Sequence, residues 1–258
     1  MNGHAAEQVA AALGFALFAA LLAWRLRLGL AAPVLRAAAR ATVQLGVVGL
    51  LIALIFEHPP LAILFVAAMV ATAAITSGGR IAVVSGSRIY AAGAIGLPAL
   101  SATGILLAVG AFEATPEAVI PTAGILIGGA MSATTLTGRR LVEGLTDDHD
   151  ELETRLALGD DVRTAVAPLV RKAITTGLVP AIDQTRSVGM VALPGTFVGL
   201  LLGGATPETA ARAQLVVLLA ILAVQIVAGL LISEAIVRRL TVSGAERLEV
   251  PRAPRHPR

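Results

Sequence analysis

Seven long apolar stretches divide this sequence, and they constrain its fold more than any other feature. A helix needs roughly 20 apolar residues to cross a bilayer core of about 30 Å. With 56% hydrophobic and 14% charged residues, the chain also differs from soluble domains, in which charged residues make up about 25%. The sequence therefore predicts an all-α, polytopic integral membrane protein with about seven transmembrane helices. The expected spans are residues 7–24, 38–56, 60–77, 89–111, 118–137, 187–203 and 210–236.

The arginines predict the orientation of these spans, since Lys and Arg are retained mainly in cytoplasmic loops. If the N-terminus lies outside, every Lys and Arg except Arg212 falls on the inner side. We therefore expect an N-out, C-in arrangement in the cell membrane. Residues 1–24 hold no Lys or Arg, so no cleaved signal peptide is expected. Residues 1–240 are expected to form one transmembrane domain with a cytoplasmic loop at about 138–187, and residues 241–258 a disordered basic tail near anionic lipid.

The predicted loop contains a short amphipathic segment among more than half of the acidic residues of the chain. Residues 151–158 (ELETRLAL) place leucines between charged residues and are followed by Gly159, which fits the stop signal of a helix. Such a helix suits insertion into a groove on another protein. The residues expected to contact a partner are Glu151, Glu153, Leu156, Leu158 and Gly159.

Four sequence motifs resemble those of a known family. They are residues 40–45 (RATVQL), 127–136 (IGGAMSATTL), 157–173 (ALGDDVRTAVAPLVRKA) and 178–195 (LVPAIDQTRSVGMVALPG). In this order they are similar to the FetB-type ABC transporter permeases, described as iron exporters, and the similarity spans about residues 36–235. The resemblance implies a permease that forms a homodimer, exports a metal ion or another small solute, and works with a separate ATP-binding subunit. The short amphipathic helix would then be the coupling helix that this subunit receives.

The nucleotide is expected to bind to the partner subunit as ATP-Mg, with no cofactor on this chain. A P-loop requires the pattern G-x-x-x-x-G-K-[ST], whereas the only lysine here, Lys172, follows Arg171. The chain departs from the resembled family where many members carry Asn, at Gly129 and Ser132, and where they carry Met, at Thr196 and Phe197. These differences weaken the expectation that iron is the cargo, and they leave any metal-ligating residues unknown.

Several polar and small residues within the motifs are candidates for a translocation pathway. Arg36, Arg40 and Gln44 recur at a spacing that places them on one helix face, as either a polar entry or arginines extending to lipid phosphates. Asp183 and Arg186 are expected at a membrane boundary, as either a salt bridge or pathway residues. Glycines also recur at four-residue spacing. This spacing suits close helix packing, a subunit interface or an interface between helices that moves during transport. The candidate residues are Arg40, Gln44, Gly129, Ser132, Asp183, Gln184, Arg186, Gly189, Pro194, Gly195 and Gly199.

Two other function classes compete with transport. A membrane anchor that regulates an ATPase would carry the same docking helix. A membrane enzyme acting on lipid-linked phosphates would need carboxylates clustered near one leaflet, and the predicted spans hold almost none. Residues 147–151 (DDHDE) could hold a divalent cation, although aspartates there also suit the N-terminus of a helix. Nucleic-acid binding is not expected, because basic residues are not interleaved with aromatic ones.

Overall fold

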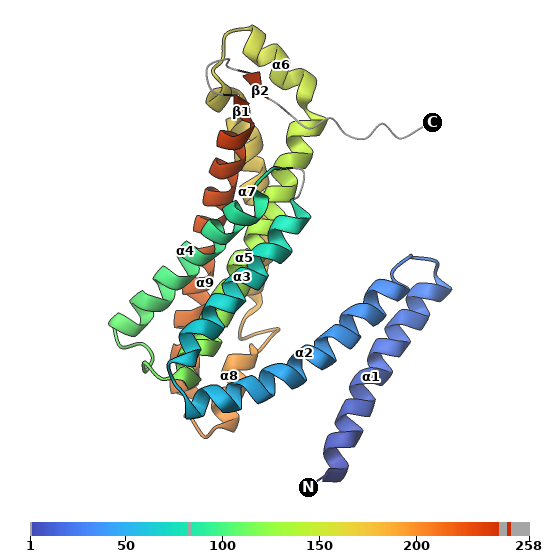
Figure 1. Ribbon diagram of the computed structural model, residues 1–258, viewed down its shortest axis with the longest axis vertical. Helices are drawn as coiled ribbons and strands as arrows, with labels where there is room; N and C mark the ends of the chain where they lie inside the picture. Colours follow the sequence, from blue (N-terminus) through green and yellow to red (C-terminus); the bar gives the residue numbers. More distant parts are fainter. Residues whose placement is uncertain (1, 82–83, 243–246, 249–258) are drawn as a thin grey trace. The chain divides into compact units, whose positions relative to one another are not determined.

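The computed structural model describes residues 2–81, 84–242 and 247–248, which are almost entirely helical (Figure 1). The helices are α1 (Asn2–Arg25), α2 (Ala31–Glu57), α3 (Leu61–Arg80), α4 (Ser87–Ala108), α5 (Pro116–Asp147), α6 (His149–Ala157), α7 (Val162–Ser187), α8 (Gly195–Leu202) and α9 (Pro207–Leu240). Two-residue strands β1 (Thr241–Val242) and β2 (Arg247–Leu248) pair antiparallel within the predicted tail. The remainder of that tail, residues 243–246 and 249–258, lies outside the described residues, so its predicted disorder stays a prediction.

Seven of the described helices are long and apolar enough to cross a membrane, which confirms the all-α polytopic prediction. They are α1, α2, α3, α4, α5, α7 and α9. The chain folds into two compact units, residues 1–59 and residues 60–258. The odd number of crossings is compatible with termini on opposite sides, and the N-out, C-in orientation stays a prediction.

The first unit is a pair of helices, α1 and α2, packed against each other and joined by a short turn at residues 26–30. Gly29 adopts a positive φ of 70° in this turn, a conformation that glycine adopts without steric cost. Most of α2 is exposed, with Ile55 its only residue classed as buried. The candidate residues Arg36, Arg40 and Gln44 are all exposed on α2.

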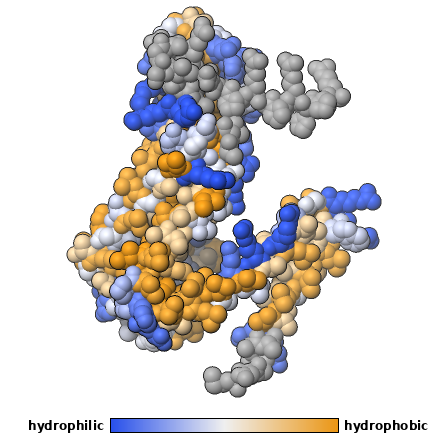
Figure 2. Space-filling model, in the orientation of Figure 1, coloured by the Kyte–Doolittle hydropathy of each residue, from blue (hydrophilic) through white to orange (hydrophobic). Residues whose placement is uncertain are grey.

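The second unit is a helical bundle in which α5 packs against α3, α4, α7 and α9. One apolar cluster fills the middle of the bundle around Ile95, Leu126 and Val224. A second cluster, around Leu141 and Ile232, fills the end that carries α6. Figure 2 shows the result on the surface of this unit, where a broad hydrophobic zone lies between hydrophilic ends.

The sequence prediction is wrong for the sixth span. Residues 162–187, expected within a cytoplasmic loop, form the long helix α7, and α5 continues through that loop as far as Asp147. The predicted span 187–203 instead holds a non-helical stretch followed by the eight-residue α8. The charged residues of α7 lowered its apparent hydropathy, while its contact face against α5, including Ala173, Gly177 and Leu178, is buried.

Candidate functional site

The α6 end of the bundle carries the predicted coupling helix. The structure confirms a short helix here, His149–Ala157, followed by Gly159 with φ of +99°. Arg155 donates to the carboxylate of Asp160 at 2.8 Å and to the carbonyl of Ala165 at 3.3 Å. These contacts attach the connection after α6 to the first turns of α7, so that α6 is presented in a defined position.

The apolar residues of α6 face in two directions. Leu152 is 4% exposed and Leu156 packs against the same core cluster of the bundle. Leu158, just beyond the helix, is 83% exposed. Of the leucines in this segment, Leu152 thus belongs to the core, whereas Leu156 is half-buried and its predicted contact with a partner stays a prediction. The surface that remains for a partner consists of Glu151, Glu153, Leu158 and Gly159, all exposed.

Asp161 caps the N-terminus of α7. Its carboxylate accepts a hydrogen bond from the backbone N–H of Thr164 at 2.8 Å, which satisfies one of the unpaired donors of the first helical turn. Hydrogen bonding to Thr164 lowers the pKa of Asp161 below its ordinary value, and the charge of Arg163 acts in the same direction. The cap fixes where α7 begins after the α6 connection.

Ion pairs join α7 to α9 at the same end of the bundle. The carboxylate of Glu234 accepts from both Arg163 and Arg238, each at 2.5 Å. Arg163 lies in α7 and the other two residues in α9, so this contact connects helices that are distant in sequence. The pair of Glu234 and Arg238 at i and i+4 lies within one helix, and Arg163 from α7 is a third member of this cluster.

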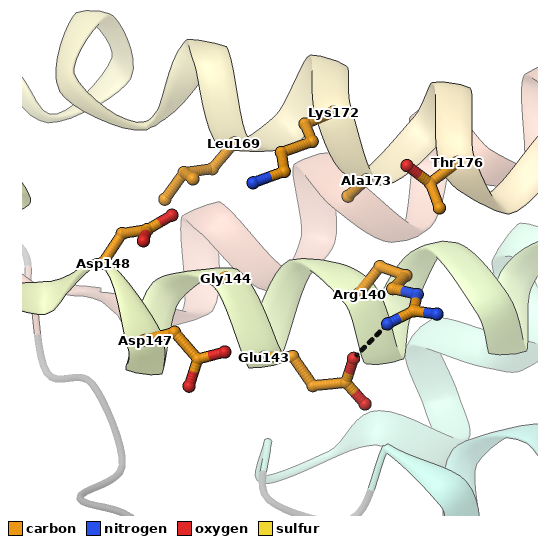
Figure 3. Close-up of a pocket in the computed structure, with 9 residues that line it drawn as sticks. All are labelled: Arg140, Glu143, Gly144, Asp147, Asp148, Leu169, Lys172, Ala173 and Thr176. Carbon is orange, nitrogen blue, oxygen red and sulfur yellow. Dashed lines mark hydrogen bonds and ion pairs between the residues drawn. The ribbon is translucent and has the colours of Figure 1, made fainter.

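A pocket of about 210 Å³ opens between α5 and α7 beside α6. Figure 3 shows Lys172 from α7 and Asp148 from the end of α5 reaching into the same space, with Arg140 paired to Glu143 at 3.1 Å. Both acidic and basic residues line the pocket, and Asp147 is one of the acidic residues. Within the described part of the chain, no group of three or more His, Asp or Glu side chains could hold a metal ion. The structure therefore gives no support to a divalent-cation site at residues 147–151.

The contact of α7 with α5 at Gly177 locates the C-terminal turns of α7 along the bundle. Gly177 is so close to α5 that an added Cβ would meet the Thr137 hydroxyl at 2.5 Å. Arg139 and Arg140, just beyond Thr137, are exposed and mark the hydrophilic end of the α5 span. At a helical rise of about 1.5 Å per residue, Asp183 lies roughly 9 Å and Arg186 roughly 14 Å from Gly177 toward the opposite end. Both residues lie in the last turns of α7, which ends at Ser187, and their place at a membrane boundary stays a prediction.

The chain leaves helical geometry directly after these residues, between α7 and α8. After Ser187 the chain runs non-helically through residues 188–194 before α8 begins, on the far side of the bundle from α6 (Figure 1). Gly189 has φ of +87°, and its N–H donates to the carbonyl of Ala192 at 3.0 Å. Pro194 precedes the first residue of α8. Discontinuous helices of this kind form substrate and ion sites in many transporters.

The glycine stripe lies on α8 rather than on a long span. Gly195 and Gly199 belong to this short helix, and Gly203 follows its last residue. An added Cβ at Gly195 or Gly199 would meet no atom within 4 Å. The stripe is thus open on a single copy of the bundle, so packing within the bundle does not explain it.

The α5 candidates have different environments. An added Cβ on Gly129 would meet Ile221 at 3.2 Å and the amide nitrogen of Gln225 at 3.4 Å, both on α9. Ser132 is exposed, and its hydroxyl donates to the carbonyl of Gly128 at 3.1 Å. The structure therefore brings Gly129 together with Gln225, while Ser132 faces outward.

Buried polar atoms of the bundle include several that the sequence did not single out. Atoms without a hydrogen-bond partner among the described residues are Oγ1 of Thr134 and Thr137 and Oε1 of Gln214 and Gln225. The threonine at 137 is the most constrained, since Gly177 and Gly229 approach it from two other helices. Thr134, Thr137 and Gln214 lie at spacings typical of ordinary core positions, so no sequence signal distinguished them, whereas an amide in the middle of an apolar stretch does mark Gln225.

Comparison with known proteins places this architecture in a family. The family described as "Uncharacterised protein family (UPF0014)" matches residues 6–241. The chain belongs to the UPF0014 family. The match includes both units, the stretch between α7 and α8, and the α6 end. No solved structure matches the chain.

Named relatives of this UPF0014 protein come from plants and bacteria. UPF0014 membrane protein STAR2 of Oryza sativa subsp. japonica is 38% identical over 81% of this chain and 74% of its own length. Protein ALUMINUM SENSITIVE 3 of Arabidopsis thaliana is 35% identical over 81% and 77%. The protein of Escherichia coli (strain K12) named "Probable iron export permease protein FetB" is 31% identical over 84% and 85%. This last match agrees with the family resemblance of the four motifs.

Proposed function

We propose that this chain is the membrane-spanning permease subunit of an ABC transporter that exports a metal ion or another small solute. ATP-Mg binds to a separate subunit, which hydrolyses the ATP. A homodimer of the chain forms the pathway within the cell membrane and its lipid. The observation that carries the proposal is a set of helices long and apolar enough to span a membrane, one of which carries Asp183 and Arg186 in its last turns, in a chain related to a named export permease.

The last turns of α7 supply the chemistry expected of a pathway. Ionisable side chains in a spanning helix are costly and mark routes for ions or substrates. Asp183 and Gln184 offer oxygen atoms, the ligand type that hard metal cations prefer. The names of two relatives refer to metals, iron and aluminum. A metal cation is therefore the cargo class that the residues and the relatives favour.

The α6 end supplies a surface for the ATP-binding subunit. A rigid element is needed to transmit motion between subunits. Here α6 is held by Leu152 in the core and by Arg155 on the α7 connection. The exposed residues Glu151, Glu153, Leu158 and Gly159 remain available for contact.

Mass spectrometry of what co-purifies with the gently solubilised chain tests the proposal. We expect a stoichiometric P-loop ATPase, and we expect it to be lost with Leu158→Asp. Val109→Asp is the matched control, since Val109 is also strongly exposed but lies beyond the other end of the bundle, after α4. Absence of any ATPase in several mild detergents would contradict the proposal. An ATPase that binds without metal efflux from cells would favour the anchor function.

A further inference from the structure

Four buried side chains of the bundle carry an oxygen atom with no hydrogen-bond partner among the described residues. They are Thr134 and Thr137 on α5 and Gln214 and Gln225 on α9. Both threonines are 0% exposed, and the glutamines are 7% and 8% exposed. An unpaired buried polar group is costly, so each one in a folded protein calls for an explanation. Hydroxyl and amide oxygens accept hydrogen bonds from water and also bind hard cations.

Other buried hydroxyl groups of the bundle are paired in the ordinary way. Thr135 Oγ1 is hydrogen-bonded to Ser77 Oγ on α3 at 3.0 Å and to the carbonyl of Met131 at 2.8 Å. Thr103 and Ser233 donate to the carbonyl four residues earlier, each at 2.8 Å. Polar side chains in membrane bundles commonly pair across or along helices in these ways. The four unpaired oxygens are therefore exceptions that helix packing does not account for.

The four side chains form a line along the contact between α5 and α9, which we call the polar line. Gln214 and Gln225 are eleven residues apart, or about three helical turns, so they lie on one face of α9. One turn further along α9, an added Cβ on Gly229 would meet Thr137 Oγ1 at 3.3 Å. Thr134 lies about one turn before Thr137 on α5. At about 1.5 Å per residue, the line covers roughly 22 Å of a bilayer core of about 30 Å.

The polar line reaches the pocket between α5 and α7 at the α6 end of the bundle. Arg140, which lines this pocket, follows Thr137 by about one turn of α5, and Thr176, another lining residue, directly precedes Gly177 on α7. Figure 3 shows Arg140 and Thr176 at the end of the pocket opposite Asp148. The close contact of Gly177 with Thr137, where an added Cβ would meet Oγ1 at 2.5 Å, comes next along both helices. The pocket is therefore in position to be the mouth of the polar line.

We propose that the polar line is a hydrated route for a cation through the bundle of a single copy, with the pocket as its mouth. Oxygen ligands can replace the water molecules around a hard cation. The inference deepens the proposed function, and it rests on that function only in identifying the cation with the exported metal. Glycines on α7 and α9 face Thr137, so no side chain from these positions fills the space beside its hydroxyl.

Isolated internal water molecules are the alternative occupant of these sites. Globular proteins hold single waters at buried polar groups. Waters in separate sites would leave the apolar packing between Gln214 and Gln225 intact, and a solute wider than a water molecule would not reach either residue. A continuous route differs because it admits a small hydrophilic reagent from the aqueous phase.

Cysteine labelling distinguishes a continuous route from isolated waters. The sequence has no cysteine, and an introduced thiol in a dry apolar site reacts slowly because the thiolate is the nucleophile. In native membranes, we expect Gln225→Cys and Thr134→Cys to react with a small, positively charged methanethiosulfonate reagent at least tenfold faster than matched controls. The controls are Val224→Cys on α9 and Ala130→Cys on α5, since both residues are buried in the apolar cluster in the middle of the bundle.

Equal labelling rates at the test and control positions would overturn the proposal. Equally slow rates would mean dry packing around separate polar atoms, and equally fast rates would mean that the whole helix bundle is loose. If Gln225→Cys does not accumulate in membranes, the comparison of Thr134→Cys with Ala130→Cys still decides the matter. Cysteine is close in size to threonine, so this variant disturbs the packing least.

A block at the pocket tests its assignment as the mouth. The reagent is added to vesicles in which Leu158→Cys is reactive, so that it arrives from the α6 side. We expect Thr176→Trp to slow the labelling of Thr134→Cys at least tenfold. Thr175→Trp is the control, because Thr175 is also exposed on α7 but does not line the pocket. Equal labelling with both tryptophan variants would overturn the assignment of the mouth.

The labelling experiments do not depend on an ATPase, so they separate this inference from the proposed function. Fast labelling at Gln225→Cys without an ATPase in co-purification would refute the proposed transporter and leave the hydrated route intact. A stoichiometric ATPase together with equal labelling rates at all four positions would refute the route and leave the transporter intact. The failures of the two proposals are therefore distinguishable.

Discussion

The absence of a side chain at Gly177 determines how closely α7 approaches α5. A Cβ there would lie 2.5 Å from the hydroxyl of Thr137 and 3.0 Å from its backbone nitrogen. Because backbone atoms cannot move aside as a flexible side chain can, the helices would have to separate. This single position therefore limits how closely α5 and α7 can pack.

We expect Gly177→Ala to lower stability by about 1–3 kcal/mol, the usual cost of overpacking a core. Gly128→Ala on α5 is the control, since an added Cβ there meets no atom within 4 Å. The control should be neutral or slightly stabilising, because alanine favours a helix over glycine. Thermal unfolding in detergent compares the two variants. Equal melting temperatures would show that the α5–α7 approach is looser than described.

Asp161 gives the α6 end a defined dependence on pH. Its pKa is lowered in the fold, so its contribution to stability is present above the ordinary aspartate value of 3.8 and is lost as pH falls through the lowered pKa. We expect amide hydrogen exchange at Thr164 and Ala165 to accelerate in Asp161→Ala. Asp161→Asn should keep the cap, since asparagine also accepts the hydrogen bond, and should remove the pH dependence. Unchanged exchange in Asp161→Ala would mean that the cap does not hold the start of α7.

At the scale of elements, α6 shows how one short helix can serve both the core and a partner. Leu152→Ala should cost about 2–5 kcal/mol, as truncation of a buried leucine does, because Leu152 packs in the core at the α6 end. Leu158→Ala is matched in chemistry but exposed, and a surface change of this kind stays within about 0.5 kcal/mol. Limited proteolysis and thermal unfolding measure the difference. Similar losses in both variants would contradict the two-sided role of α6.

The sequence predicted most elements because their apolar residues form long uninterrupted runs. Spans one to five and the last span fall on α1, α2, α3, α4, α5 and α9. The sixth crossing was missed because α7 buries a narrow face of small residues, such as Ala173 and Gly177, and carries charges on its exposed face. Hydropathy averages both faces and therefore favoured the apolar residues 187–203, most of which are not in a spanning helix.

The sequence predicted which residues belong to the candidate site better than it predicted their positions in the fold. Asp183, Gln184 and Arg186 were singled out from a motif, but their place in the last turns of a long helix appears only in the structure. The packing of Leu152 and Leu156 against the core could not be read from α6 alone, since an amphipathic helix can turn its apolar face to its own chain or to another. The contacts of Gly177 with α5 and of Glu234 with α7 join helices that are distant in sequence, so only the structure shows them.

At the scale of the whole molecule, the family match extends over both compact units of the chain. It covers residues 6–241, including both α1–α2 and the bundle. The first unit is largely exposed helix with few buried residues. Because exposed arginines on a spanning helix are costly in lipid, we expect α2 to be covered by protein in the assembled transporter.

The orientation of the chain follows from its arginines and can be tested at its turns. With the N-terminus outside, the connection at residues 109–115 and the turn at 203–206 lie outside, and the turn at 26–30 and the connection at 158–161 lie inside. In the absence of native cysteines, we expect a membrane-impermeant maleimide to label Glu113→Cys and Thr206→Cys on intact cells. Leu28→Cys and Leu158→Cys should react only after the membrane is permeabilised.

The four cysteine positions make this test of orientation internally controlled. Each lies in a connection between helices rather than within one, so all four should be reachable from one side or the other. The reverse pattern would place the basic connections outside, against the retention of Lys and Arg in the cytoplasm, and would put α6 beyond the reach of a cytoplasmic ATPase. The proposed coupling would then be refuted.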